Sequence, residues 1–465
     1  MKDLTLIKIS EILASPLVNE TNDTASLELK SVVIDSRKAE EGGLFIATKG
    51  EKTDGHSYIK DVKEKGVLGV VCEKVPDVEI PYILVEDSFK ALSLIAKFYR
   101  SVLDIPVIGV TGSVGKTSTK EFIAGTLLAK LNVLKTIGNF NNEVGMPLTL
   151  LSIREEHQVA VIEMGISEPG EMTRLSEVAK PDICVITNIG ECHLEKLIDR
   201  DGVLKAKTEI FKHMNKEGSI YLNGDDDKLI TVKKPYDVEP VRYGFRSIND
   251  ISVENIKDLG LLGSDVTIIL DNNEGKMARR VDVHVPLPGR HMILNAMVAA
   301  GIADSFGLSL KEIAKGIASV KATGGRSNVI RAGEYTVIDD CYNANPTSMK
   351  SAIKLLNMAD TRKVAILGDM FELGADEKEL HREVGAYAVS HGVDVLITIG
   401  ELSKNMFQGA LECGRFNDAP MFCFDTKEAA MEELHDILKP GDSILIKASH
   451  GMHLEKIVEF LKERR

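Results

Sequence analysis

The stretch that most constrains the fold is residues 107–118, an apolar run that breaks into glycines and then reads Gly-Lys-Thr ahead of a helical pattern. Gly112 and Gly115 let backbone N–H groups turn inward around an anion. Lys116 adds a positive charge, and Thr117 offers a hydroxyl to Mg²⁺. A glycine turn of this kind between a strand and a helix predicts an α/β protein that binds ATP or GTP.

One position departs from the general phosphate-loop pattern G-x-x-x-x-G-K-[ST]. The pattern has glycine where this chain has Val110, and the nearest glycine, Gly109, comes one residue early. On these residues alone, a tight strand-to-helix turn that binds no nucleotide remains the alternative.

Length and composition narrow the class of protein. A chain of 465 residues predicts roughly three domains of about 150 residues each. The chain has 57 Lys and Arg residues and 70 Asp and Glu residues, and its net charge of -13 argues against a partner that is nucleic acid or anionic lipid. The first residues show no signal-peptide core and no run is long enough to span a membrane, so we expect a cytoplasmic protein. The six scattered cysteines contain no C-x-x-C, which predicts neither a disulfide framework nor a thiolate zinc site.

Strand and helix patterns divide the chain into three predicted α/β domains, residues 1–100, 101–324 and 325–465. The first is a small unit of short strands and polar turns. A helix over 89–102, capped by Asp87 or Ser88, leads to Pro106 and the phosphate-loop strand.

The second domain is predicted to hold a largely parallel sheet and the third a Rossmann-like, doubly wound sheet. A hairpin over 250–285, with a turn at 271–275, and a helix near 291–306 close the second domain. The predicted strands beyond the phosphate loop cover 159–163, 183–187, 219–222, 335–339, 363–367, 393–397, 421–424 and 443–446.

Residues at the carboxyl ends of these strands are the candidates for ligand contacts. Glu163 closes an apolar strand and is either a solvated strand end or a ligand of Mg²⁺. His193 follows the next strand, and a lone histidine there is either a packing residue or a neighbour of the nucleotide.

Lys207 is marked by helical geometry. In the helix predicted for residues 202–214 it lies on the apolar stripe with Val203 and Ile210, opposite the charged face. Such a lysine either extends its stem to reach water or is partly buried for a chemical reason. Burial lowers a lysine's pKa, so a neutral Lys207 amine is able to take up CO₂ as a carbamate and become an oxygen ligand for Mg²⁺.

Polar residues also gather in the third domain. Asp339 and Asp340 end a strand, and either carboxylate is placed to hold a ribose hydroxyl. Asn343 and Asn345 precede a helix that begins near a proline, so ordinary capping is their alternative role. Arg326, at the domain junction, is either a linker residue or a clamp on the γ-phosphate.

Taken together, these motifs resemble those of the Mur ligases, which build the peptide of bacterial cell-wall precursors by ATP-driven amide formation. Residues 109–117 match the family's loop G-x-T-G-[TS]-x-G-K-T in full, so Val110 is a family trait. The other shared motifs are Gly138-Asn-Phe-Asn-Asn-Glu-Val-Gly-Met-Pro147, Glu163-Met-Gly165, Asp339-Asp-Cys-Tyr-Asn-Ala-Asn-Pro346 and Leu367-Gly-Asp-Met-Phe-Glu-Leu-Gly374.

These motifs are similar to those of the family member that adds D-alanyl-D-alanine to UDP-N-acetylmuramoyl-tripeptide. The segments 35–37 and 54–56 resemble its UDP-sugar domain, and the Asp-Asn-Pro-Arg motif of the ligase for the third residue is absent. The resemblance implies an acyl-phosphate mechanism, ATP, two Mg²⁺ ions and a monomer. It leaves open whether lysine or diaminopimelate is the third residue.

The resemblance also implies a role for each candidate. Lys116 contacts the β- and γ-phosphates, Thr117 and Glu163 hold one Mg²⁺, and His193 and carbamylated Lys207 hold the second. The implied ATP contacts are Gly112, Ser113, Val114, Gly115, Lys116, Thr117, Ser118, Asn142 and Asn295 (adenine), Asp340 (ribose) and Arg326 (γ-phosphate). The implied substrate contacts are Ser36, Arg37, Asp54 and His56 for the UDP-sugar, and Asn343 and Asn345 for the dipeptide.

Three departures from the family pattern stand out. Met292 replaces the usual asparagine after His291, residues 197–199 read Leu-Ile-Asp in place of Phe-Gly-Ser, and residues 447–450 read Lys-Ala-Ser-His in place of Lys-Gly-Ser-Arg. Two alternatives remain from the sequence: a folylpolyglutamate-type ligase with the same ATPase core, or an inert nucleotide-binding regulatory protein.

Overall fold

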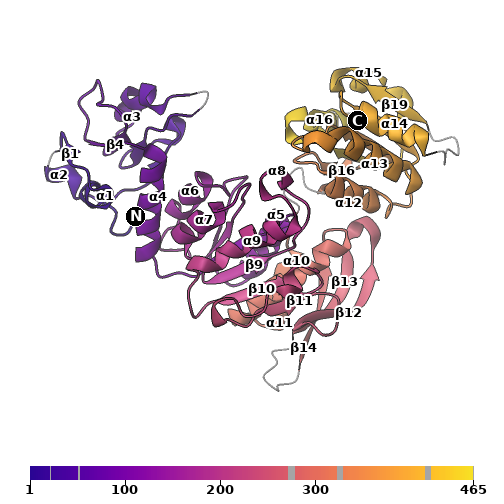
Figure 1. The fold of residues 1–465 in the computed structure, drawn as a ribbon, viewed down its shortest axis with the longest axis horizontal. Coiled ribbons are helices and arrows are strands. Elements are labelled where there is room, and N and C mark those ends of the chain that lie inside the picture. Colours follow the sequence, from indigo (N-terminus) through magenta and orange to yellow (C-terminus); the bar gives the residue numbers. More distant parts are fainter. Residues whose placement is uncertain (21, 51–52, 271–277, 322–327, 414–419, 464–465) are drawn as a thin grey trace. The chain divides into compact units, whose positions relative to one another are not determined.

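Five short strands make the first sheet of the chain, in the order β1-β5-β4-β3-β2, with β1 antiparallel to β5 and the other pairs parallel. In this computed structural model, residues 21, 51–52, 271–277, 322–327, 414–419 and 464–465 are left undescribed (Figure 1). The elements are α1 (Leu6–Leu13), β1 (Leu17–Val18), α2 (Asn22–Ala25), β2 (Val32–Val33), η1 (Ser36–Lys38), β3 (Leu44–Ile46), η2 (Gly55–Tyr58), α3 (Ile59–Glu64), β4 (Gly69–Cys72) and β5 (Tyr82–Leu84).

Helix α4 (Ser88–Val102) leads from this sheet into the second one, as predicted. The Asp87 side chain accepts hydrogen bonds from the N–H groups of Phe89 and Lys90, which satisfies two of the donors left open at a helix start. Its apolar face packs into a core shared by both sheets.

The second sheet includes the run β11-β10-β9-β6-β8-β7, and all pairs within this run are parallel. From β6 the chain crosses to β7 on one side and later reaches β9 and β10 on the other. In sheets with such a reversal, ligands bind at the carboxyl ends of the strands beside it, here β6 and β9. The elements are β6 (Val107–Thr111), α5 (Lys116–Leu127), β7 (Val133–Lys135), α6 (Gly145–Leu151), β8 (Val159–Glu163), α7 (Glu171–Ala179), β9 (Ile183–Ile186), α8 (Leu194–Leu197), α9 (Arg200–Thr208), η3 (Glu209–His213), β10 (Ser219–Asn223), η4 (Leu229–Thr231), η5 (Pro235–Asp237) and β11 (Val241–Tyr243).

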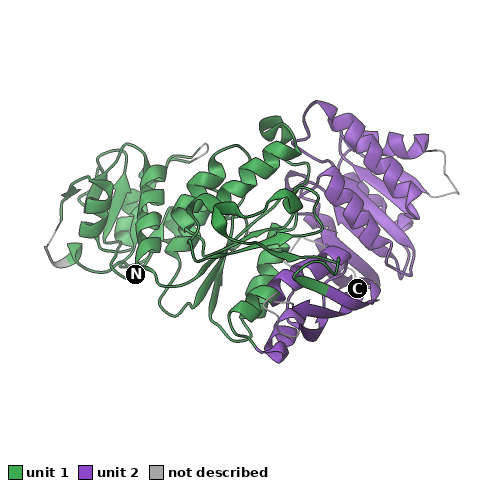
Figure 2. Cartoon of the chain, turned by 60° about the horizontal axis from the view of Figure 1, so that its bottom comes forward, with its two compact units in different colours: residues 1–252, 301–308 green, residues 253–300, 309–465 purple. Residues whose placement is uncertain are grey.

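The chain divides into two compact units (Figure 2). Unit 1 comprises residues 1–252 and 301–308, and unit 2 comprises residues 253–300 and 309–465. Strand β12 (Ile251–Asp258) starts in unit 1, where Ile251 pairs with Tyr243, and continues into unit 2. Helix α10 (Arg290–Ser305) contributes its first part to unit 2 and its end to unit 1.

Unit 2 contains the predicted hairpin and the third sheet. Strands β13 and β14 pair antiparallel from Ser264↔Val285 to Leu270↔Arg279, and the predicted turn at 271–275 lies outside the described residues. The third sheet has the order β15-β16-β20-β17-β18-β19, antiparallel only between β15 and β16.

The remaining elements of unit 2 alternate between strand and helix from β16 onward, as a doubly wound domain requires. They are η6 (Gly260–Leu262), β13 (Ser264–Leu270), β14 (Arg279–Val285), α11 (Leu310–Ala318), β15 (Asn328–Ala332), β16 (Tyr335–Asp340), α12 (Pro346–Leu356), β17 (Lys363–Gly368), η7 (Gly374–Asp376), α13 (Glu377–Ser390), β18 (Val395–Ile399), α14 (Lys404–Glu412), β19 (Met421–Phe424), α15 (Lys427–Ile437), β20 (Ser443–Lys447), η8 (His450–Met452) and α16 (Glu455–Glu463).

The predicted fold class is confirmed: each of the three sheets is mainly parallel and flanked by helices. One predicted element differs. The helix expected over 202–214 is α-helical only to Thr208 and continues as the tighter 3₁₀ turn η3, although Val203 and Ile210 are both buried as expected. All six cysteines are free thiols. Among the described residues, no helix has the length and apolar character needed to cross a membrane.

Candidate active site

The phosphate loop follows β6 at the carboxyl edge of the second sheet. Gly112 has φ 151°, and a Cβ there would collide with the Thr187 hydroxyl. Gly115 has φ 82° and is the N-cap of α5, so the open N–H groups of that helix start face the loop. Lys116 is the first helical residue, and its Nζ donates to the Gly112 carbonyl at 2.8 Å. The predicted cradle for an anion is therefore formed by backbone geometry that only glycine adopts readily.

Thr117 and Glu163 meet beside this loop, as the sequence predicted. The Thr117 hydroxyl donates to Glu163 Oε2 at 2.7 Å, and both side chains are buried, with Glu163 1% exposed. Thr136 holds the Glu163 backbone, since its hydroxyl accepts from the Glu163 N–H at 2.9 Å. A hydroxyl and a carboxylate together supply the hard oxygen ligands that suit Mg²⁺ alongside a nucleotide phosphate.

Two further residues touch the Glu163 carboxylate and were missed by the sequence analysis. Asn141 Nδ2 donates to Glu163 Oε1 at 2.8 Å, and Lys120 Nζ lies 3.9 Å from Oε2. The signal for Asn141 was present, because it stands beside Asn142 in a motif singled out for its asparagines. Lys120 gives no sequence signal, since a lysine in the first turns of a helix is ordinary.

Asn142 lies just before α6, and its side chain closes the turn that leads into this helix. Its Oδ1 accepts from the N–H groups of Val144 and Gly145 at 3.2 and 2.8 Å. These contacts give the residue a structural role in unit 1, and the adenine contact expected of it stays a prediction.

His193 lies on the connection that follows β9, in a left-handed conformation with φ 51° at the start of α8. Its backbone carbonyl accepts from the N–H groups of Lys196 and Leu197, while the side chain is exposed. Cys192, one residue earlier, donates its thiol to the Ser113 hydroxyl of the phosphate loop at 3.2 Å. The histidine is thus attached to the phosphate loop through its immediate neighbour.

Lys207 is buried, at 1% exposure, so its stem does not carry the amine to water. Burial, and then the positive charge of Lys116, lower the pKa of the Lys207 amine to about 7, against a weaker opposing effect from Cys192. A large fraction of the amine is therefore neutral at neutral pH. This is the protonation state from which an amine adds to CO₂.

Unit 2 holds Asn295 and Asp340, which are expected to contact adenine and ribose. Asn295 is buried, and its Nδ2 donates to Met292 Sδ at 3.5 Å, so the departure at position 292 touches the expected adenine residue. Asp340 accepts from Lys447 Nζ at 2.6 Å. The sequence analysis quoted Lys447 in the altered motif at 447–450 but gave it no role.

Lys447 also donates to the Asn343 carbonyl at 2.8 Å, which ties this segment to β20. The Asn343 side chain accepts from the Ala344 N–H, and Asn345 forms a reciprocal cap with Ser348 at the start of α12. The capping alternative therefore describes Asn345 well, and contact with a dipeptide stays a prediction. Arg326 lies outside the described residues.

The expected UDP-sugar residues make local contacts in the first sheet. Arg37 pairs with Asp35 at 2.8 Å, and its guanidinium is exposed. His56 Nδ1 lies 2.6 Å from Asp54 Oδ1, and its Nε2 accepts from the Glu73 N–H at 2.9 Å. Because Nε2 accepts, the ring proton is assigned to Nδ1 and is donated to Asp54, whose pKa these bonds hold well below its usual range. The Ser36 carbonyl accepts from Lys65.

Comparison with known proteins places this site in a family. Three family profiles match: "Mur ligase family, catalytic domain" over residues 28–105, "Mur ligase middle domain" over 110–303, and "Mur ligase, glutamate ligase domain" over 325–450. A Bacillus subtilis protein named UDP-N-acetylmuramoyl-tripeptide--D-alanyl-D-alanine ligase is 37% identical, and the match covers 99% of this chain and 98% of that one. The chain belongs to the Mur ligase family.

Other Mur ligases agree with this assignment over the whole chain. The Escherichia coli protein of the same name is 32% identical and is covered to 99%, with 100% of this chain matched. A crystal structure of MurF from Acinetobacter baumannii superposes with a TM-score of 0.88 at 30% identity, covering 99% of each chain. A folylpolyglutamate synthase from Mycobacterium tuberculosis, at 16% identity and a TM-score of 0.62, shares the fold alone.

Proposed function

We propose that this Mur ligase joins D-alanyl-D-alanine to UDP-N-acetylmuramoyl-tripeptide and consumes ATP in doing so. The names of its full-length relatives support these substrates. The observation that carries the proposal is the convergence, at one sheet edge, of the phosphate-loop Lys116, the Thr117–Glu163 pair and the buried amine of Lys207.

The phosphate loop binds the nucleotide in this proposal. The start of α5 directs N–H groups and the favourable end of its dipole at the phosphates, and Lys116 adds a full positive charge. A MurF from Thermotoga maritima, 27% identical with a TM-score of 0.79 and 93% of this chain covered, was crystallised in complex with ADP. Asn142, Asn295, Asp340 and Arg326 remain the proposed contacts to the rest of ATP.

Two Mg²⁺ ions are part of the proposal. Thr117 and Glu163 would hold the first, and His193 together with carbamylated Lys207 would hold the second. To form the carbamate, the neutral amine attacks CO₂, a nitrogen–carbon bond forms, and one amine proton leaves. When bound, the ions offset the repulsion between the two anionic reactants and the charge on the transferring phosphoryl group.

The reaction then proceeds in two steps. A carboxylate oxygen of the tripeptide attacks the γ-phosphorus, the bond to the β-bridging oxygen breaks, and ADP leaves an acyl phosphate behind. The amine of the dipeptide attacks the acyl carbon, loses a proton, and expels inorganic phosphate from the tetrahedral intermediate. The Lys116 ammonium contacts the phosphoryl oxygens in both steps and stabilises the negative charge that develops on them.

The remaining assignments concern substrates and setting. Ser36, Arg37, Asp54 and His56 are the proposed UDP-sugar contacts, and Asn343 and Asn345 the proposed dipeptide contacts. We place the reaction in the cytoplasm, where the ATP that it consumes is available. We also propose that the protein is a monomer.

Substrate omission tests the function directly. We expect phosphate release from ATP only when the acceptor tripeptide and the dipeptide are both present, with equal amounts of phosphate and new amide. Release that is as fast without the dipeptide would contradict ligation. Activity with a folate substrate would favour the folylpolyglutamate-type alternative, and nucleotide binding without any turnover would favour a regulatory protein.

A further inference from the structure

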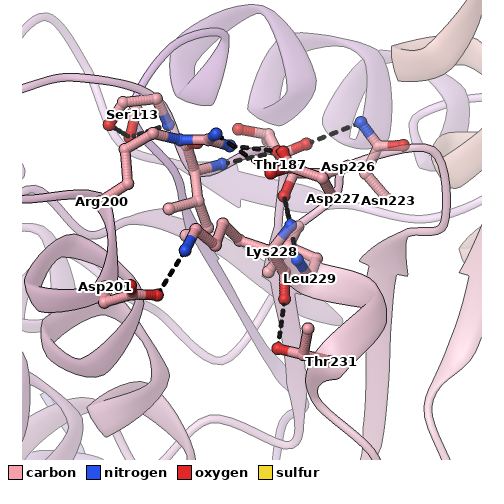
Figure 3. Close-up of polar contacts among 12 residues, drawn as sticks. Ser113, Thr187, Arg200, Asp201, Asn223, Asp226, Asp227, Lys228, Leu229 and Thr231 are labelled. Carbon is pink, nitrogen blue, oxygen red and sulfur yellow. Dashed lines mark hydrogen bonds and ion pairs between the residues drawn. The ribbon is translucent and has the colours of Figure 1, made fainter.

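The segment that begins at the last residue of β10, residues 223–227, reads Asn-Gly-Asp-Asp-Asp and has no role in the preceding account. We refer to it as the acidic loop. Because β10 is paired in parallel with β9, the acidic loop lies beside the connection that follows β9, residues 187–193, referred to below as the β9 loop. Figure 3 shows the polar contacts between the two. The β9 loop ends at His193, one of the two proposed ligands of the second Mg²⁺.

Asp226 connects the two loops. Its Oδ1 accepts from the N–H groups of Lys228 and Leu229 at 3.0 and 2.9 Å, which closes the turn of the acidic loop itself. Its Oδ2 faces the other way and accepts from the Ile189 N–H at 2.9 Å. Asn223 adds a second contact, from its Nδ2 to the Thr187 carbonyl at 3.1 Å. One carboxylate therefore shapes the acidic loop and holds the β9 loop at the same time.

Asp227 acts on the same residue, Ile189, through Arg200. Arg200 Nε donates to the Ile189 carbonyl at 3.0 Å, and its two terminal nitrogens lie 3.1 and 2.5 Å from the Asp227 carboxylate oxygens. Arg200 is the first residue of α9, the helix that carries Lys207. Arg200 thus fixes the start of α9 to two loops. It makes one hydrogen bond to the β9 loop and a two-point, charge-assisted contact to Asp227 of the acidic loop.

On its other side the β9 loop is held by the phosphate loop. The Gly190 N–H donates to the Ser113 hydroxyl at 2.9 Å, and that hydroxyl donates to the Gly190 carbonyl at 3.2 Å. Asn188 forms a matching pair with Val114, at 3.0 Å to its N–H and 2.8 Å to its carbonyl. The β9 loop is therefore held on one side by the phosphate loop and on the other by the acidic loop, to which no ligand has been assigned.

We propose that the acidic loop positions His193 and Lys207 relative to the phosphate loop. Asp226 sets the β9 loop, and with it His193, through Ile189. Asp227 sets the start of α9, and with it Lys207, through Arg200. This inference rests on the proposed function, which assigns these two residues to the second Mg²⁺.

A direct metal-binding role for the three carboxylates fits the contacts less well. Asp225 already accepts from the Phe245 N–H, from Arg246 and from Asn249. Asp226 and Asp227 are occupied as described above. Across the part of the chain that the structure describes, no group of three or more His, Cys, Asp or Glu side chains is arranged to hold a metal ion.

Asp226→Asn and Asp225→Asn form a matched pair of variants. Each replaces one carboxylate of the acidic loop, removes one charge and turns one accepting oxygen into a donor. In Asp226→Asn the retained oxygen keeps the turn to Lys228 and Leu229, and the amide then faces the Ile189 N–H, donor against donor. In Asp225→Asn the contacts that are weakened are those to residues 245–249, away from the β9 loop.

Two readouts separate positioning from general stability. One is the Mg²⁺ concentration for half-maximal ligation, and the other is the carbamate signal in ¹³C NMR after exposure to ¹³C-labelled bicarbonate, with Lys207→Ala as the blank. We expect Asp226→Asn to raise the Mg²⁺ concentration for half-maximal ligation at least threefold and to reduce the carbamate signal to half or less. KM for the dipeptide should stay within twofold of the parent value. Asp225→Asn should stay within twofold of the parent in all three.

Equal effects of the two variants, whether both small or both large, would overturn the positioning role. If the parent itself gives no carbamate signal and Lys207→Ala remains fully active, it is the assignment of Lys207 that fails. The Mg²⁺ comparison between Asp226→Asn and Asp225→Asn still decides the positioning role in that case, through His193.

Discussion

A lysine placed where an apolar residue belongs is the residue-scale feature that links sequence to chemistry. Lys207 shares the buried face of its helix with Val203, and burial leaves much of its amine neutral near pH 7. A fully buried, unpaired ammonium is costly, so the folded state gains by lowering the pKa of this group. The same change makes the amine a nucleophile.

Removing this amine tests its role in the reaction. We expect Lys207→Ala to lower kcat by about 100-fold or more, because the second Mg²⁺ loses a ligand. Lys205→Ala, two residues away on the exposed face of the same helix, is the control and should leave kcat within twofold. Equal activity in both variants would remove the carbamate from the mechanism.

The lowered pKa also predicts how stability depends on pH. Between pH 7 and 10.5, the folded and ordinary pKa values of Lys207, the unfolded chain binds this proton and the folded chain does not. The free energy of unfolding therefore rises with pH across this window, by up to about 1.4 kcal/mol per pH unit from this group. Lys207→Met should lose that slope in urea unfolding measured in CO₂-free buffer. Parallel curves for the two proteins would contradict the burial of a neutral amine.

At the scale of elements, the connection from α8 to α9 carries a strained residue. Ile198 has φ 71° and ψ −60°, and it is 82% exposed. A β-branched side chain rarely adopts positive φ. The Phe-Gly-Ser pattern implied by the family resemblance has glycine at this position, where such a backbone carries little strain. The departure at 197–199 thus introduces strain between the proposed ligands His193 and Lys207.

We expect Ile198→Gly to stabilise the protein, by about 1 kcal/mol after the entropy cost of glycine is subtracted from the relief of strain. Chemical denaturation gives this difference directly. Ile248→Gly is the control, because Ile248 is 85% exposed and is absent from the residues with positive φ. A loss of stability in Ile198→Gly as large as in Ile248→Gly would show that position 198 carries no strain.

Elements with a regular apolar pattern were predictable, and contacts between loops were not. The strand at 159–163 has the predicted limits, and the helix after Asp87 ends where predicted and begins one residue early, because continuous burial and a capping carboxylate leave local signals. The change from α9 to η3 leaves no such signal, since the apolar stripe is compatible with both geometries. Glu163 follows from the rule for parallel strand ends, whereas Asn141, Asp226 and Lys447 act through chain segments that only the fold brings together.

At the scale of the whole molecule, the sequence predicted three domains with boundaries near 100 and 324. The order of sheets along the chain follows this pattern, with one mainly parallel sheet in each region. The division into two compact units does not coincide with the predicted boundaries. It falls within β12 and within α10. A helix that continues from one unit into another shows one uninterrupted pattern in sequence, so its division was not predictable. The two boundaries themselves stay a prediction.

The central claim is that ATP activates the acceptor carboxylate as an acyl phosphate before the dipeptide amine attacks. An acceptor tripeptide labelled with ¹⁸O at both oxygens of its reacting carboxylate tests this claim most directly. The account predicts that each phosphate released during ligation carries one ¹⁸O and that the new amide retains the other. Phosphate released without label, or labelled phosphate without an amide product, would contradict it.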